Sequence, residues 1–150
     1  MNVLAPVSTI MTSQLITVNP KDTLKRVKEI FDKNQIHHLP VVRYKKIVGI
    51  VSKGDFLHFL HGFSHDEADE KLSENRLNTW KVEQIMTGGL AKVDSKEPIR
   101  TALEIFKLNH FHAIPVIDEG ELAGIVTTYD IIRTLADEPI HLEDYKTANV

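Results

Sequence analysis

The sequence contains no cysteine, and its longest apolar runs are only a few residues long. The absence of cysteine excludes disulfide frameworks, thiolate zinc sites and cysteine nucleophiles. Runs this short exclude a membrane span, and the N-terminus lacks the basic segment followed by a hydrophobic one that marks a signal peptide. We therefore expect a cytoplasmic protein with no membrane association.

Positive charge is also in short supply, since the 150 residues have a net charge of -3. This argues against general nucleic-acid binding, which requires a basic surface. The charge is unevenly distributed: residues 1–62 hold nine Lys or Arg and four Asp or Glu, a net of +5, whereas residues 82–150 hold six and twelve, a net of -6. The halves of the chain are therefore electrically opposite.

Despite this difference, the two halves repeat each other at one constant offset. Pro40 matches Pro115 and Gly49 matches Gly124, 75 residues apart in both cases and with no gap between them. Roughly a third of the aligned positions are identical, which indicates a tandem duplication. We divide the chain into a first repeat, an acidic helical linker, a second repeat and a C-terminal tail, at residues 1–62, 63–81, 82–136 and 137–150.

Each copy has the same pattern of predicted elements. Apolar residues recur at helical spacing from Leu24 to Phe31 and again from Ile99 to Phe106, which predicts one amphipathic helix in each copy. Two β-rich runs follow each helix and predict a hairpin, and a second helical stretch follows each hairpin. The sequence predicts an α/β (α+β) fold in which each copy runs strand, helix, strand, strand, helix.

Three motifs occur in both copies in the same order. Each copy opens with IMT, at Ile10 and Ile85, continues with a segment that ends in PV, and closes with glycine, two apolar residues, Ser or Thr, two free residues and Asp. From about Val7 to Leu135 the chain resembles a stand-alone CBS-domain pair, or Bateman module. The resemblance implies two lobes packed with pseudo-twofold symmetry, usually paired into dimers. It also implies two clefts that bind AMP, ADP, ATP or S-adenosylmethionine.

The closing motif has two interpretations. A hydroxyl at a helix N-cap with a carboxylate three residues later forms a capping box, which stabilises a helix by about 1 kcal/mol and needs no ligand. A helix N-terminus is also a natural binding site for phosphate, and a nearby carboxylate can accept hydrogen bonds from both hydroxyls of a ribose. The resemblance assigns phosphate to the hydroxyl and ribose to the aspartate, which gives Ser52 with Asp55 and Thr127 with Asp130 as ligand-binding residues.

Histidines precede PV in both copies. Relatives in the family often place a basic residue two positions before the proline to meet phosphate, and that position holds His38 in the first copy and Ala113 in the second. Histidine is charged only near or below its pKa of about 6.5, so the two clefts should differ in phosphate affinity. His37 and His112 are either further cleft residues or partly buried structural histidines.

A cluster of histidines raises metal binding as a less favoured alternative. His58, His61 and His65 could share a helical face, with Asp66 beside them. However, Gly62 should end that helix, and the second copy has no equivalent. We find no nucleophile paired with a base, so we expect neither a metal site nor an enzyme.

Two functions from different classes remain. The first is a regulatory module that senses an adenosine-type ligand and acts, by a change of lobe or dimer geometry, on an unidentified protein on another chain. The second is a ligand-free dimerisation scaffold. Both functions include a homodimer, because the apolar face of the last helix in each copy is larger than packing against its hairpin requires, and the surplus suggests a partner. The expected interface residues are Phe56, Phe59, Leu60, Ile131 and Leu135.

Overall fold

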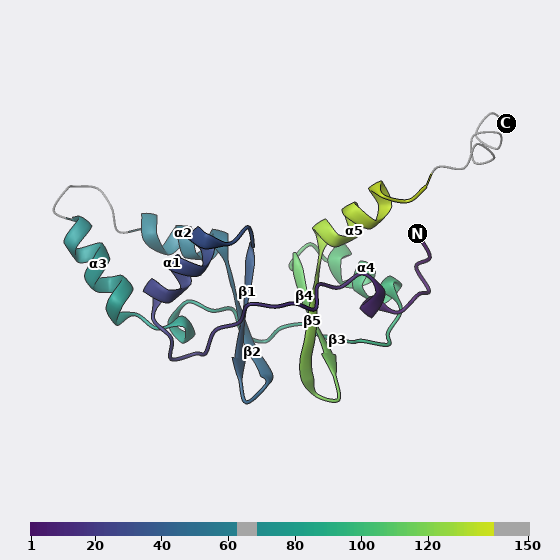
Figure 1. The fold of residues 1–150 in the computed structure, drawn as a ribbon, viewed down its shortest axis with the longest axis horizontal. Helices are drawn as coiled ribbons and strands as arrows, with labels where there is room; N and C mark the ends of the chain where they lie inside the picture. Colours follow the sequence, from purple (N-terminus) through teal and green to yellow (C-terminus); the bar gives the residue numbers. More distant parts are fainter. Residues whose placement is uncertain (63–68, 140–150) are drawn as a thin grey trace.

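A computed structural model describes residues 1–62 and 69–139, and it shows two β-hairpins side by side, each flanked by helices (Figure 1). The helices are α1 (Leu24–Lys33), α2 (Lys53–His61), α3 (Asp69–Thr79), α4 (Ile99–Lys107) and α5 (Thr128–Ala136), with short 3-10 turns at Val7–Thr9 and Val82–Gln84. The strands are β1 (His38–Arg43), β2 (Lys46–Ser52), β3 (Val93–Asp94), β4 (Ala113–Asp118) and β5 (Glu121–Thr127). This arrangement confirms the predicted mixed fold of two similar halves.

The first strand predicted for each copy forms fully only in the second. There β3 pairs in parallel with β4, and the ladder continues as the Ser95 N–H donates to the carbonyl of Ile117 at 2.8 Å. In the first copy the strand is reduced to a single bridge between Val18 and Val41. Pro20 occupies the position equivalent to Ser95 and has no N–H to donate, which explains why the ladder stops.

Both hairpins close with two-residue turns whose central residues have positive φ. These residues are Tyr44 and Lys45 in the first hairpin, and Glu119 and Gly120 in the second, as expected for type I′ turns. The two turns lie close together: the Leu122 N–H donates to the carbonyl of Lys45 at 3.0 Å. Lys45 Nζ also lies 4.0 Å from Glu121 Oε2, so part of the opposite charge of the two halves is neutralised within the chain.

The predicted amphipathic helices supply the cores. Thr23 caps α1 by accepting a hydrogen bond from the Arg26 N–H, and Leu24, Val27 and Phe31 are buried on its inner face. Ile99 and Ala102 are the buried residues of α4. Burial of large apolar side chains, at roughly 25 cal/mol per Å² of apolar surface, is the main term that holds each half together.

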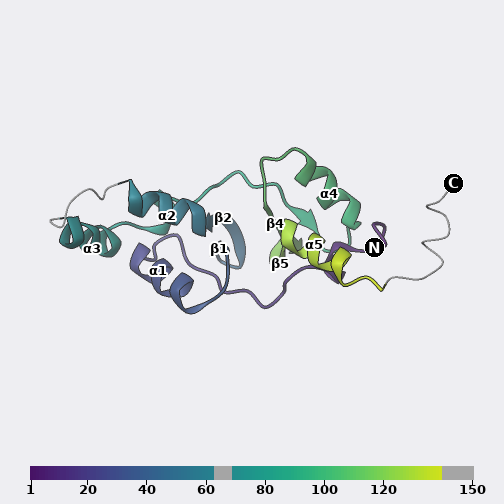
Figure 2. The ribbon, with the colours of Figure 1, turned by 90° about the horizontal axis from the view of Figure 1, so that it is seen from above.

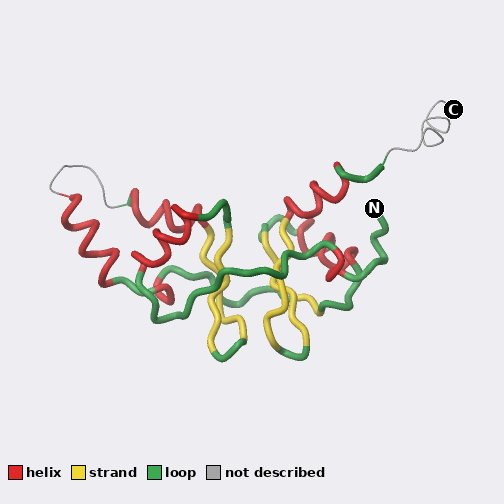
Figure 3. Tube along the Cα trace, in the orientation of Figure 1, coloured by secondary structure: helices red, strands yellow, loops and turns green. Residues whose placement is uncertain are grey.

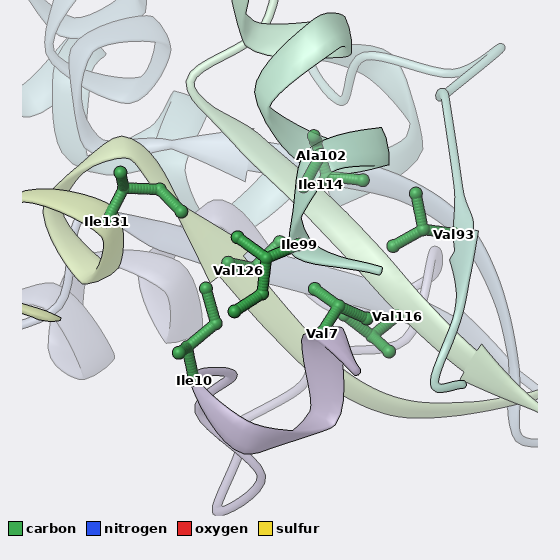
Figure 4. Packing of buried hydrophobic residues seen from close by; sticks show 9 residues of the cluster. All are labelled: Val7, Ile10, Val93, Ile99, Ala102, Ile114, Val116, Val126 and Ile131. Atoms are coloured by element: carbon green, nitrogen blue, oxygen red, sulfur yellow. The ribbon is translucent and has the colours of Figure 1, made fainter. Parts of the chain in front are cut away.

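The opening segment of each copy packs in the core of the other copy. Val7 and Ile10 lie against Ile114, Val126 and other residues of the second copy (Figure 4). Val82 lies reciprocally in the first copy's core, against residues that include Leu24 and Phe31. The two lobes are therefore not the two sequence copies, because each lobe needs a segment from the other copy.

The repeated IMT and glycine motifs meet where these segments cross. The Thr12 N–H donates to the Ile125 carbonyl at 2.9 Å, and the Ile125 N–H donates to the Thr12 carbonyl at 3.0 Å. A Cβ on the neighbouring Gly124 would lie only 2.5 Å from Met11 Sδ. Thr87 pairs with Ile50 in the same way beside Gly49. Glycine recurs because the IMT backbone approaches the strand too closely for a side chain.

The predicted acidic linker contains α3, which packs beside α1 at one end of the molecule (Figure 2). Leu77 and Trp80 pack against the first lobe's core, and the Trp80 ring lies 5.0 Å from that of Phe59. Residues 63–68, and the tail beyond residue 139, lie outside the described residues.

Two of the residues expected at a dimer interface are buried within the monomer. Phe56 is 3% exposed and lies in the first core, and Ile131 is 8% exposed and lies in the second. That expectation is corrected, because these side chains contact their own lobes and cannot also face a partner. Phe59 and Leu60 are half-buried against the first core, and Leu135 is 52% exposed.

Candidate functional site

A cavity of about 500 Å³ is lined by residues of both copies, including the corner where α5 begins. Figure 3 shows that helices follow both hairpins at this same end of the strands. The first copy supplies residues 35–38 and Pro40, and the second copy supplies the corner between β5 and α5. Five of the predicted ligand-binding residues line this one cavity: His37, His38, His112, Thr127 and Asp130. The structure thus places His38 in the cavity of Asp130, a choice that the sequence left open.

Thr127 and Asp130 form the predicted capping box at the start of α5. The Asp130 N–H donates to Thr127 Oγ1 at 3.2 Å, while Asp130 Oδ2 accepts from the Thr127 N–H at 2.8 Å and from its hydroxyl at 2.7 Å. Asp130 is only 4% exposed. Its other oxygen, Oδ1, accepts from Arg133 Nη2 at 3.1 Å. Both carboxylate oxygens therefore have partners within α5 and its cap.

Ser52 and Asp55 are arranged differently. Ser52 caps α2 by accepting from the Asp55 N–H at 3.0 Å, and the two side chains meet at 2.6 Å. The Asp55 side chain is exposed, and neither residue lines the 500 Å³ cavity. Asp55 lines a separate hollow of about 410 Å³, beside His58 and Thr87. The two repeated motifs are thus alike in sequence and unlike in surroundings.

The backbone fixes the histidines at the helix starts. The carbonyl of His37 accepts the Lys53 N–H of α2 at 2.8 Å, and the carbonyl of His112 accepts the Thr128 N–H of α5 at 3.2 Å. His37 and His112 are exposed, whereas His38 is half-buried. Ala113, at the position equivalent to His38, is buried between the hairpins. The second copy therefore offers no polar side chain at this position.

The environment of His38 favours its neutral form. Burial lowers the pKa of His38 from its ordinary value, and the nearby charges of His37 and His112 lower it further, while Asp55 has a smaller opposing effect. Both effects disfavour the imidazolium, because charge loses hydration on burial and like charges repel. His38 is consequently a hydrogen-bonding group at neutral pH rather than a fixed positive charge.

Sequence reasoning missed Arg133, which lines the same cavity. Its guanidinium reaches Asp130, three residues earlier on α5, and its side chain remains 49% exposed. The sequence could have indicated this contact through the spacing of Asp130 and Arg133, because residues three positions apart lie on the same face of a helix. Copy one has His58 at the equivalent position, which also distinguishes the two motifs.

Residues 1–62 and 69–139 contain neither a metal-binding cluster nor a membrane-spanning helix. Within these ranges, no group of three or more His, Asp or Glu residues is placed to hold a metal ion. His65 and Asp66, from the histidine cluster considered above, lie outside the described residues. No helix in the same ranges has the length and apolar character needed to cross a bilayer.

Two similar halves that exchange segments around a shared cavity define a class of tandem-repeat module. The CBS domain model matches the chain twice, over residues 7–62 and 82–137. The chain belongs to the CBS domain family, as the repeated motifs indicated.

Relatives and solved structures agree with this assignment. An uncharacterized protein of Methanocaldococcus jannaschii is 30% identical over 146 residues, which cover 91% of this chain and 52% of that protein. The chain thus spans about half of that relative's length. CBSX2 of Arabidopsis thaliana, in complex with AMP, has a TM-score of 0.70 and 25% identity over 88% of this chain and 96% of its own. The CBS domain pair of protein MJ0100, in complex with 5-methylthioadenosine and S-adenosyl-L-methionine, has a TM-score of 0.69 and 25% identity over 89% and 97%.

Proposed function

We propose that this chain is a regulatory module that binds an adenine nucleotide or another adenosine derivative. The observation that carries the proposal is the 500 Å³ cavity, which is lined by histidines of the first copy and by Thr127 and Asp130 of the second. A carboxylate and hydroxyl at a helix N-terminus suit a ribose and a phosphate. The complexes of the two similar structures with adenosine compounds support the same ligand class.

The cavity also suggests how binding is transmitted. Because its walls come from both copies, a ligand contacts the first hairpin and α5 at once. Binding shifts the arrangement of these parts only to the extent that the ligand prefers one arrangement over another. The regulated protein would be another chain in the cytoplasm, and the module itself would be no enzyme.

A thermal-shift panel tests the proposal. The panel contains AMP, ADP, ATP, NAD, S-adenosylmethionine and a guanine nucleotide. A ligand at one hundred times its Kd stabilises the folded chain by about 2.7 kcal/mol, which should raise the midpoint by roughly 5–10 °C. Only the adenosine compounds should produce this shift. Flat responses across the panel contradict the proposal.

Calorimetry then assigns the site. Asp130→Asn should abolish or strongly weaken AMP binding in the cavity, since each hydrogen bond to a charged group contributes about 1.5–3 kcal/mol. Asp55→Asn removes the same group from the exposed motif and is the matched control for this cavity. Equal and mild losses in both variants, alongside comparable losses of thermal stability, indicate that the two aspartates act only as helix caps.

The second candidate function, a dimerisation scaffold, is favoured by apolar side chains left exposed on α5. Ile132 is 61% exposed and Leu135 is 52% exposed, one turn apart. Replacement of both by glutamate should convert a dimer to monomers in sedimentation, without loss of the fold. Leu108→Glu is the matched control, because Leu108 is 61% exposed but lies at the end of α4. A wild-type chain that sediments as a monomer at micromolar concentration rules out this function.

A further inference from the structure

Arg133 is the one permanent cation among the described residues that line the 500 Å³ cavity. The other basic residues on the wall are His37, His38 and His112, and burial keeps the pKa of His38 low. An arginine guanidinium remains protonated at any physiological pH and presents several N–H donors in a planar fork. A ligand that brings an anionic group into this cavity therefore meets its strongest fixed positive charge at Arg133.

In the structure this guanidinium is bound to the carboxylate that would hold the ribose. Asp130 Oδ2 accepts from the backbone and hydroxyl of Thr127, whereas Oδ1 accepts from Arg133 Nη2 at 3.1 Å. The carboxylate is almost fully buried, and the arginine side chain is half exposed. Because burial leaves little open space around the carboxylate, a ribose hydroxyl that donates to Oδ1 competes with Arg133 for this oxygen, while the Thr127 contacts can persist.

We propose that this exchange makes Arg133 the residue that selects 5′-phosphorylated adenosine over uncharged adenosine in the cavity. The inference rests on the proposed function. Adenosine would displace Arg133 from a buried carboxylate and offer no anion in return. A 5′-phosphate supplies one, and its oxygens match the guanidinium fork in a bidentate pair. The ribose thus takes the carboxylate, and the phosphate takes the arginine that the ribose has released.

The first copy lacks the parts needed for such an exchange. The equivalent aspartate, Asp55, is exposed, and its Oδ2 accepts a hydrogen bond from the Ser52 hydroxyl at 2.6 Å. The residue three positions later is His58, whose imidazole has no bidentate fork. Selection of 5′-phosphorylated adenosine over uncharged adenosine should therefore occur in the Asp130 cavity and be weak or absent beside Asp55.

The test measures the affinities of AMP and adenosine by calorimetry and compares their ratio between variants. The component removed by Asp130→Asn identifies the cavity. Arg133→Met should lower the AMP-to-adenosine affinity ratio about tenfold or more, through loss of AMP binding. Arg133→Lys keeps the charge but loses the fork, so its ratio should fall between those of the wild type and Arg133→Met. Arg100→Met removes an exposed charge of α4 outside the cavity and should leave the ratio unchanged.

The AMP-to-adenosine affinity ratio distinguishes a role of Arg133 in ligand selection from a purely structural role. If Arg133 only positions Asp130, then Arg133→Met weakens AMP and adenosine equally, and the inference is overturned. The same holds if wild-type protein binds both compounds equally well, or if Asp130→Asn removes no component; in either case the proposed function can still stand. Wild-type protein that binds no compound of the thermal-shift panel overturns the proposed function, and the inference with it.

Discussion

Replacement of Gly124 by alanine should separate the two copies where they cross. The new Cβ would lie 2.5 Å from Met11 Sδ and 2.9 Å from the Thr12 carbonyl oxygen. The methionine side chain can rotate away, but the carbonyl is held by the Ile125 N–H at 3.0 Å. The strand and the crossing segment must therefore move apart. Overpacking of this kind costs typically about 1–3 kcal/mol, which corresponds to a fall in Tm of roughly 2–12 °C.

Two other glycines calibrate this expectation in the same urea and thermal unfolding experiments. Gly49→Ala should cost less than Gly124→Ala, because its nearest backbone atom, the Thr87 oxygen, lies at 3.1 Å rather than 2.9 Å. Gly54 is an exposed residue of α2, and a Cβ added there would have Ser52 Oγ as its nearest neighbour, at 3.7 Å. Gly54→Ala should therefore stabilise the protein by about 0.5–1 kcal/mol, through the higher helix propensity of alanine.

The double variant Gly124→Ala/Met11→Ala shows which contact matters. If the Met11 sulfur were the whole obstacle, the double variant would be as stable as Met11→Ala alone. We expect a further loss, because the contact with the Thr12 carbonyl remains. A Gly124→Ala protein that unfolds together with the wild type, or with Gly54→Ala, would refute the close-approach explanation of the repeated glycine.

Two further predictions concern pH and a turn. The pKa of His38 is lower in the folded chain than its unfolded value of about 6.5, so the stability present above pH 6.5 should be lost as the pH falls through the folded pKa. His38→Gln should reduce this acid-side loss in urea unfolding between pH 7 and 5, and an unchanged slope would exclude His38 as its cause. Lys45 has a φ of 63°, so Lys45→Gly should stabilise the first hairpin by about 1 kcal/mol. Gly120→Lys, at the equivalent position with a φ of 82°, should have the opposite effect, and equal Tm values in all three proteins would contradict the turn assignment.

Helices and their caps could be predicted from the sequence, because they depend on residues that are close together in the chain. The stripe from Leu24 to Phe31 predicted α1, and Thr127 with Asp130 predicted the start of α5. The ladder that stops after Val18 is also a local effect, since Pro20 cannot donate where Ser95 does. The sequence nevertheless predicted a full strand there, because the cost of a proline in a strand depends on whether its missing N–H would face a partner strand.

The duplication by itself determined the fold class and the family, because periodicity, caps and repeated motifs each act within one copy. Only the tertiary structure decided which copy completes which lobe, since Val7 and Val82 are buried by long-range packing that no local pattern specifies. The same packing makes His38 line the cavity of Asp130, whereas Asp55 lines a separate hollow. Two similar motifs therefore acquire different surroundings, because their burial and their partners depend on which residues of the other copy pack against them.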